Sequence, residues 1–77
     1  MESELIGEVR AAHRLPSPAA ARAIRLAAGV GQTRMARELG VNRVTVARWE
    51  CGTRRPRGPL LQAYVDLLED LQREALR

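Results

Sequence analysis

Two short stretches of apolar residues joined at Gly40 constrain the fold of this chain more than any other feature. Within residues 32–49, five apolar side chains recur at helical spacing: Met35, Leu39, Val41, Val46 and Trp49. That spacing places them on the inner faces of two consecutive helices. Gly40 permits the left-handed backbone of a sharp reversal, and the small Ala36 lets two helices cross closely. The segment therefore predicts two helices packed at a steep angle.

Capping residues predict where these two helices begin and end. Gly31 precedes a helix over residues 32–39, and Asn42 is a strong N-cap for a helix over residues 43–51. Gly52 then stops the second helix, because glycine tolerates the left-handed conformation that ends many helices. These signals predict a helix-turn-helix over residues 32–51.

The remaining residues predict three more helices. An apolar stripe predicts an N-terminal helix within residues 1–15: Leu5, Ile6, Val9 and Ala12. Ser17, followed by a proline, is a start signal for a second helix that ends at Gly29. A basic loop over residues 53–58 leads to an extended C-terminal helix over residues 59–77.

Length and charge limit what such a chain can do. A chain of 77 residues allows one domain, so we expect a single compact all-α domain of five helices over residues 1–77. Residues 22–57 hold nine arginines and two acids, a net charge of +7 in a chain whose total is +4. A basic block of this kind is typical of a protein that binds a polyanion. The alternative is a solvated, arginine-rich surface.

Several functional classes are disfavoured by residue types. One cysteine allows no internal disulfide, and with one histidine no catalytic constellation or metal site can be assembled. We therefore expect no enzyme, no cofactor and no metal. The first ten residues lack an apolar run long enough for a signal peptide or membrane span, so we expect a cytoplasmic protein without a membrane partner.

The outer face of the helix expected over residues 43–51 has an unusual composition. With Val46 and Trp49 directed inward, the opposite face carries Val44, Ala47 and Arg48, with Arg43 at its flank. A face that only contacts water is usually rich in Glu, Lys and Gln. A small, apolar face with two arginines indicates a surface that contacts a partner.

The stretch IRLAAGVGQTRMARELGVNRVTVARWECGTRRP resembles the lambda-repressor-like (XRE-type) helix-turn-helix family of phage repressors, Cro proteins and bacterial relatives. The resemblance extends over residues 21–68 and departs from the family pattern in two places. Gly31 stands where the family usually has Ser, Thr or Asn, and the first fifteen residues have no clear counterpart. The resemblance implies a five-helix bundle whose recognition helix enters the DNA major groove.

The resemblance also implies which residues contact DNA. Base reading is expected from Arg43, Val44, Ala47 and Arg48. Arginine reaches guanine O6 and N7, and small apolar groups contact thymine methyl groups. Phosphate contact is expected from Gln32, Thr45, Arg54, Arg55 and Arg57. Alternatives remain open: Gln32 as an ordinary exposed residue, Thr45 in helix packing, and the loop arginines as solvated side chains.

Arg25 and Glu50 match a family pair that forms a structural salt bridge between the second helix and the end of the recognition helix. The alternative is an exposed glutamate that contributes little to stability. If the pair forms, Glu50 is structural and does not present an acid to DNA.

The last helix predicts a homodimer. By resemblance, four of its residues belong to the core: Leu61, Tyr64, Val65 and Leu68. That leaves Leu60, Leu67 and Leu71 as an exposed stripe that needs a cover. A second copy in a two-fold dimer is the favoured cover, and the N-terminal helix of the same chain is the alternative.

Together these features predict a sequence-specific double-stranded DNA-binding transcriptional regulator, a small Cro-like phage or prophage repressor in a bacterial cell or phage-infected host. An operator duplex is the expected partner, with no small-molecule ligand. One alternative is an antitoxin or adaptor-type protein-interaction module, which the acidic C-terminal helix favours. Another is an excisionase-like architectural DNA binder.

Overall fold

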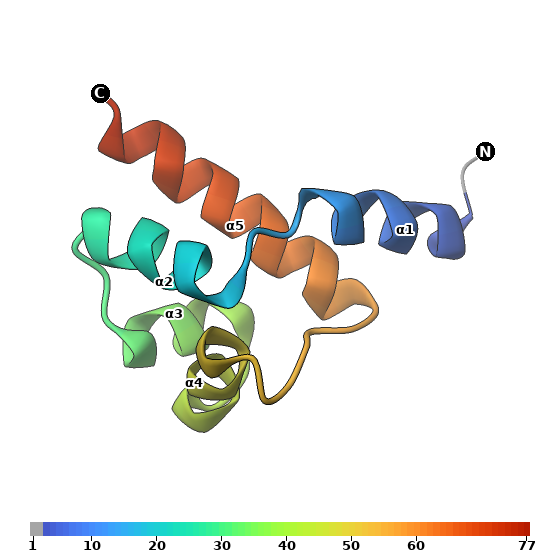
Figure 1. The fold of residues 1–77 in the computed structure, drawn as a ribbon, viewed down its shortest axis with the longest axis horizontal. Coiled ribbons are helices and arrows are strands. Elements are labelled where there is room, and N and C mark those ends of the chain that lie inside the picture. The colour runs from blue at the N-terminus through green and yellow to red at the C-terminus, as the bar shows by residue number, and fades with distance from the viewer. Residues whose placement is uncertain (1–2) are drawn as a thin grey trace.

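A computed structural model describes residues 3–77, and over that range the chain is helical without strands (Figure 1). The helices are α1 (Glu4–Arg14), α2 (Pro18–Ala27), α3 (Gln32–Leu39), α4 (Arg43–Cys51) and α5 (Pro59–Ala75). Figure 1 shows α5 crossing the molecule, with α2, α3 and α4 gathered at one side and α1 projecting at the other end. The all-α fold with an extended C-terminal helix is confirmed. Residues 1–2 of the expected N-terminal segment lie outside the described residues.

Local capping explains most of the helix boundaries. The side chains of Ser17 and Asn42 accept hydrogen bonds from the backbone N–H groups of the helices they precede, at 3.1 and 3.0 Å. Gly40 and Gly52 end α3 and α4 in the left-handed conformation, with φ of 71° and 80°. Gly31 provides no side-chain cap for α3. The sequence signals at these positions are confirmed.

The main core joins α4 to α5 and the helices around them. Its centre is Trp49 against Tyr64, whose ring centroids lie 4.7 Å apart at a 46° tilt. Offset aromatic contacts of this kind add stability beyond the apolar area they bury. The other buried members come from α2, α3, α4 and α5: Ala21, Met35, Ala36, Val46 and Leu68. This packing fixes α4 with one face inward.

The three leucines of α5 that were expected to form an exposed stripe are partly covered by the chain itself. Leu60, Leu67 and Leu71 are half-buried and pack against the main core cluster. The reason is that α5 contacts α1, α2 and α3, so more than one of its faces is covered. Leu67 and Leu71 also line a shallow hollow with Val30 and Met35. The stripe is therefore partly covered within one chain, and its role as a dimer interface stays a prediction.

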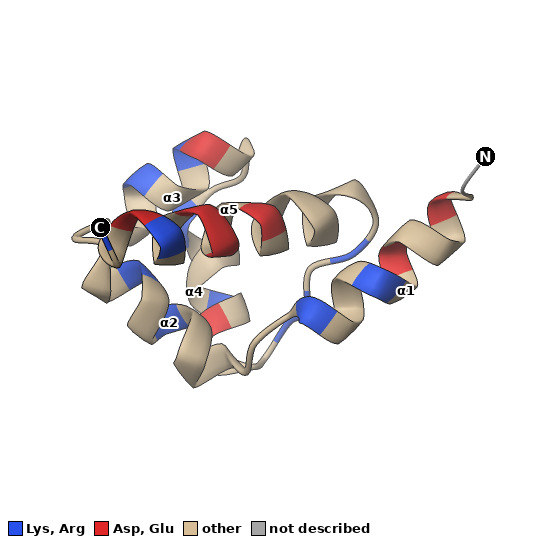
Figure 2. Cartoon of the chain, turned by 90° about the horizontal axis from the view of Figure 1, so that it is seen from above, with Lys and Arg blue, Asp and Glu red and all other residues tan. Residues whose placement is uncertain are grey.

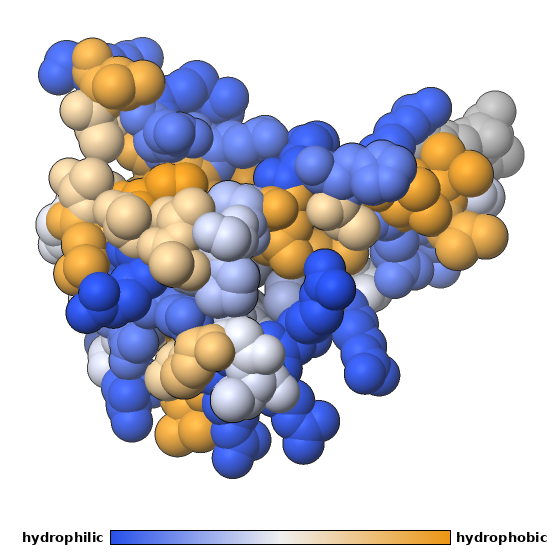
Figure 3. Space-filling model, viewed as in Figure 1, coloured by the Kyte–Doolittle hydropathy of each residue, from blue (hydrophilic) through white to orange (hydrophobic). Residues whose placement is uncertain are grey.

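The N-terminal helix buries a different face from the one expected. α1 packs on α5 through Ala11, which is 0% exposed and shares a small second cluster with Leu61 and Val65. Leu5 is 67% exposed, and Ile6 and Val9 are each 43% exposed. The apolar stripe of α1 thus faces away from the core. Figure 3 shows hydrophobic side chains at the surface of this end of the molecule.

Candidate nucleic-acid interface

α4 presents two faces of different chemistry. Val46, Trp49 and Glu50 are buried on its inner side. On the outer side, Val44 is 43% exposed, Arg43 and Arg48 are exposed, and Ala47 is half-buried. Figure 3 shows apolar atoms surrounded by strongly hydrophilic side chains at the end of the molecule that contains α4. The structure brings the four expected base-reading residues together on one helix.

The predicted salt bridge forms between α2 and α4. Arg25 Nε donates to Glu50 Oε2 at 2.6 Å, and Arg25 Nη2 donates to Glu50 Oε1 at 2.9 Å. Both side chains are buried, with 6% and 3% of their surfaces exposed. Burial by itself raises the pKa of Glu50, but hydrogen bonds from Arg25 and Gln32 and the charge of Arg25 hold it below its ordinary value. Glu50 therefore stays a carboxylate.

Gln32 connects this buried pair to the exposed face. Its side-chain amide donates from Nε2 to Glu50 Oε1 at 3.1 Å. Its Oε1 accepts a hydrogen bond from Arg43 Nη1 at 3.0 Å. Both ends of the Gln32 amide are thus engaged within the protein. The chain of contacts from Arg25 to Arg43 holds the guanidinium of Arg43 at the start of α4.

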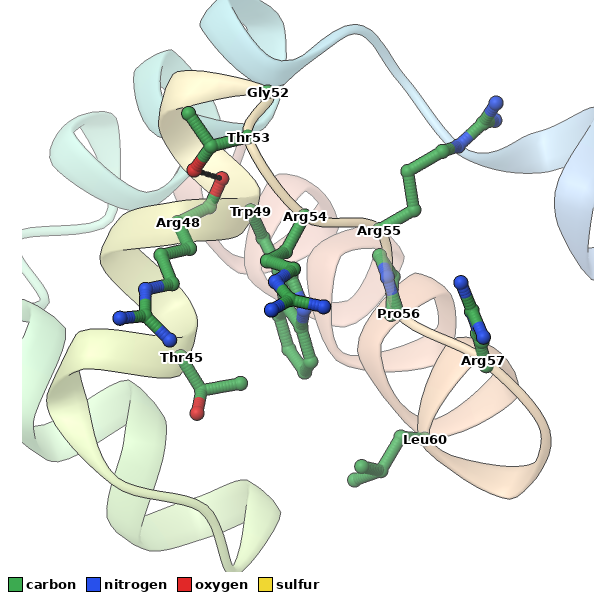
Figure 4. A pocket seen from close by; sticks show the side chains of 10 residues that line it. All are labelled: Thr45, Arg48, Trp49, Gly52, Thr53, Arg54, Arg55, Pro56, Arg57 and Leu60. Atoms are coloured by element: carbon green, nitrogen blue, oxygen red, sulfur yellow. Dashed lines mark hydrogen bonds between the residues drawn. The ribbon is translucent and has the colours of Figure 1, made fainter.

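A cleft of about 740 Å³ separates α4 from the basic loop that follows it (Figure 4). Thr45 and Arg48 line it on the α4 side, Arg54 and Arg57 on the loop side, and Trp49 lies between them. Figure 4 shows Arg55 projecting away from α4. The Thr45 hydroxyl is already bonded, because it donates to Asn42 Oδ1 at 3.1 Å. A strand of phosphates fits the chemistry of a cleft with arginines on both walls.

In the structure the basic loop spans residues 53–57, because Gly58 is the N-cap residue of α5, and it is anchored at its start and at its centre. The backbone N–H groups of Thr53 and Arg54 donate to the carbonyl oxygen of Arg48, at 3.1 and 3.3 Å. Pro56 is buried and lines the floors of two adjoining hollows. The three loop arginines are exposed around it: Arg54, Arg55 and Arg57. The loop therefore presents its positive charges from a fixed backbone.

The acidic residues of α5 lie away from this surface (Figure 2). Figure 2 shows acidic residues gathered along α5, outside the α4 face. Two of them, Asp66 and Glu69, bind Arg14 of α1 at 2.6 and 2.8 Å. The hydrogen bond from Arg14 lowers the pKa of Glu69. The surface around α4 and the loop is consequently basic and suited to a polyanion.

Comparison with protein families matches residues 10–76 to a helix-turn-helix domain. The chain belongs to this family. The match includes α2, α3, α4 and α5 and most of the residues discussed above, which confirms the resemblance seen in the sequence. A search of curated proteins and a search of solved structures find no match to the chain.

Membership of the helix-turn-helix family makes this a DNA-binding domain, with α3 and α4 as its two motif helices. The helix-turn-helix begins and ends where the sequence predicted, from Gln32 to Cys51. No helix in residues 3–77 is both long and apolar enough to cross a bilayer.

Sequence reasoning missed one contributor to this surface, Glu8, and did not foresee the partners of a second, Gln32. Glu8 of α1 accepts a hydrogen bond from the Gly58 N–H at 3.1 Å, where the basic loop meets α5. Gln32 was expected at a phosphate but bonds to Glu50 and Arg43. Glu8 lies 50 residues from Gly58 in the chain, so no local signal marks their contact.

Proposed function

We propose that this chain is a sequence-specific double-stranded DNA-binding transcriptional regulator, a small repressor of the Cro type. The observation that carries the proposal is the outer face of α4, where exposed Arg43 and Arg48 flank the small apolar side chains of Val44 and Ala47. Arginine reads guanine through O6 and N7, and small apolar side chains contact thymine methyl groups. The major groove accommodates a helix of this kind.

The same proposal gives the basic loop a separate role. Arg54, Arg55 and Arg57 lie beside α4 rather than on it, so they are suited to phosphates at the edge of the groove. Phosphate contacts set affinity and register, whereas base contacts set sequence preference. Thr45 and Gln32 are weaker phosphate candidates, since their polar side-chain atoms already have partners in the protein.

The proposed regulator acts as a homodimer on a near-palindromic operator, in the cytoplasm of a bacterial cell or phage-infected host. A two-fold dimer places two recognition helices about 34 Å apart, one turn of DNA. Leu60, Leu67 and Leu71 are partly covered by their own chain, whereas Leu5, Ile6 and Val9 of α1 form an exposed apolar stripe that a second copy could cover. We propose no small-molecule ligand for this regulator. Its occupancy of an operator would then be controlled by its concentration and by competition with other proteins for the same site.

Salt dependence of duplex binding tests the proposal. Binding of a labelled duplex is measured by fluorescence anisotropy over a range of salt concentrations, with wild-type protein and with Arg54→Ala and Arg57→Ala. A DNA binder loses affinity steeply as salt rises, and each lost phosphate contact lowers the slope by about 1. Duplex binding that is absent, or that does not respond to salt, would contradict the proposal.

A second candidate is a protein-interaction module of the antitoxin or adaptor type. The exposed apolar stripe of Leu5, Ile6 and Val9 on α1 favours it, because such a stripe on a small monomer is suited to a protein partner. This candidate predicts a partner that remains bound at salt concentrations where the duplex dissociates.

A further inference from the structure

We infer that Glu8 is a positioning residue for the DNA-contacting arginines, because it holds the end of the basic loop in place from α1. The inference rests on the proposed function, since the loop matters only if it contacts phosphates. It assigns a role to α1, the helix that lies farthest along the chain from the helix-turn-helix and contacts only α5 among the helices.

The contact itself joins two elements that are distant in sequence. Glu8 Oε1 accepts a hydrogen bond from the Gly58 N–H at 3.1 Å, and both residues are half-buried. Gly58 has φ of 57° and ψ of −140°, and no side chain caps the start of α5. The Glu8 carboxylate therefore takes the place of a local cap. A negative charge at this end of α5 is also favoured by the helix dipole.

The loop has two ends, and each is held by a different helix. Its first residues are bonded to the carbonyl oxygen of Arg48 at the end of α4. Its last residue, Arg57, is adjacent to Gly58, whose N–H is held by Glu8. Arg57 is also tied to α5, because its carbonyl oxygen accepts a hydrogen bond from the Leu61 N–H at 3.4 Å, and buried Pro56 precedes it. Glu8 adds a contact from outside α5 at the junction between the loop and that helix.

α1 is itself fixed well enough to act as an anchor. Ala11 is fully buried against Leu61 and Val65, which brings the two helices close together. Farther along α1, Arg14 Nε and Nη2 donate to the Glu69 carboxylate at 3.0 and 2.8 Å. Glu8 therefore projects from a helix that is bound to α5 at two other points. Because α1 is held against α5, the Glu8 side chain can hold the end of the basic loop.

Glu8 lies outside the residues that match the helix-turn-helix family, which begin at residue 10. The family match therefore assigns no role to Glu8.

Removing the Glu8 carboxylate would change DNA affinity in opposite directions if Glu8 acts by positioning the loop or only through its negative charge. Removing a carboxylate from a DNA-binding protein strengthens phosphate binding through long-range electrostatics. Loss of a positioning contact weakens phosphate binding, because the loop arginines are then less ordered in the free protein and must be ordered when DNA binds. Glu4 provides a matched control: it is an exposed carboxylate on the same helix and lines the same hollow beside Gly58.

The test compares Glu8→Ala, Glu8→Asp, Glu8→Gln and Glu4→Ala in duplex binding across salt concentrations. Glu8→Ala is expected to bind roughly threefold to tenfold more weakly, with a salt slope lower by about 1. Glu8→Asp retains the charge but withdraws the carboxylate, so it should weaken binding in the same direction. Glu8→Gln removes the charge but keeps an oxygen acceptor, so it should bind at least as tightly as wild type, and Glu4→Ala should do the same.

Hydrogen exchange of the backbone amides provides a second measurement that does not depend on DNA. In Glu8→Ala and Glu8→Asp, the Gly58 amide should exchange about tenfold faster while the amides of α3 and α4 keep their rates, because one hydrogen bond to a charged group is lost. If Glu8→Ala does not fold, Glu8→Asp decides the question. If Glu8→Asp and Glu8→Ala bind as tightly as Glu4→Ala, the positioning role is overturned while the proposed function stands. If the wild type itself does not bind duplexes, the proposed function fails and the inference with it.

Discussion

Arg25 and Glu50 form a bidentate ion pair inside the protein, with Nε–Oε2 and Nη2–Oε1 distances of 2.6 and 2.9 Å. A third donor of the same guanidinium, Nη1, bonds the carbonyl oxygen of Val30 at 2.7 Å. One arginine therefore fixes the end of α2, the turn before α3 and the inner side of α4. The orientation of the proposed reading face depends on this contact.

Glu50→Gln should lower the free energy of unfolding by about 3 kcal/mol, because it leaves a buried guanidinium without its charge partner. Thermal or denaturant unfolding of Glu50→Gln, Arg25→Met and the double variant measures the coupling. Glu38→Gln is the matched control, since the Arg34–Glu38 pair is exposed and its loss should cost less than about 0.5 kcal/mol. Equal, additive losses in the two single variants would mean that the pair contributes no coupling.

The same pair predicts a dependence of stability on acid pH. The pKa of Glu50 in the folded protein lies below its ordinary value of 4.5. A carboxyl group of this kind contributes stability that is complete above the unfolded pKa and is lost as pH falls through the folded pKa. Unfolding free energy should therefore fall below about pH 4.5 in the wild type, and more weakly in the Glu50→Gln, Arg25→Met double variant.

Tyr64 predicts a second pH effect, at the alkaline end. Its hydroxyl is the buried side-chain polar atom without a partner in residues 3–77, and burial raises its pKa from 10.0 to about 12. Because the unfolded chain ionises first, stability should fall by about 2 to 3 kcal/mol between these two pKa values. Tyr64 is the only tyrosine, so absorbance of the tyrosinate follows this residue alone.

Tyr64→Phe is the control for that titration. It removes the buried hydroxyl and should raise stability by about 1 kcal/mol at neutral pH while abolishing the alkaline loss. A variant that is less stable than wild type by a similar amount would show that the hydroxyl has a stabilising partner.

Gln32→Met should reduce discrimination between duplex sequences more than it reduces binding to all duplexes. Methionine fills a similar volume but can neither accept a hydrogen bond from Arg43 nor donate one to Glu50. The Arg43 guanidinium then loses the hydrogen bond that fixes its position. Binding to a preferred site should weaken by about 1 kcal/mol, measured against a mismatched duplex. Equal losses on every duplex, with a lower salt slope, would instead indicate that Gln32 contacts a phosphate directly.

Leu67→Glu and Leu5→Glu distinguish the core from the surface. Leu67 is half-buried against the main cluster, so a carboxylate there should lower stability by about 2 to 4 kcal/mol. Leu5 is mostly exposed, so Leu5→Glu should preserve stability but shift a monomer–dimer equilibrium in sedimentation. A Leu67→Glu protein that is stable and loses dimers would restore the α5 stripe as the dimer interface.

Much of the fold could be predicted because its signals are local. Gly40 and Gly52 end helices, and Asn42 caps the start of one, through contacts with residues only a few positions away. These roles match those inferred from the sequence. The inner face of α4 was predictable for a similar reason, since Val46 lies three residues before Trp49, the largest apolar residue of the helix. The candidate reading face then followed as the opposite side of the same helix.

The placement of α1 could not be predicted from its apolar stripe. A stripe shows which side of a helix is apolar but not which side meets a neighbour. Here a small residue, Ala11, permits close approach to α5, and polar contacts of Glu8 and Arg14 fix the orientation. These contacts join residues about 50 positions apart, so only the tertiary structure shows them.

Selection of bound sites from random duplexes is the most direct test of the claim that the outer face of α4 reads DNA. The wild type should enrich one near-palindromic motif that contains a preferred guanine. Arg43→Ala or Arg48→Ala should lose about 1 to 3 kcal/mol on that motif and relax the preference at a guanine, whereas Arg55→Ala should retain the motif with weaker binding overall. An unenriched pool, or an unchanged motif with both Arg43→Ala and Arg48→Ala, would contradict the account.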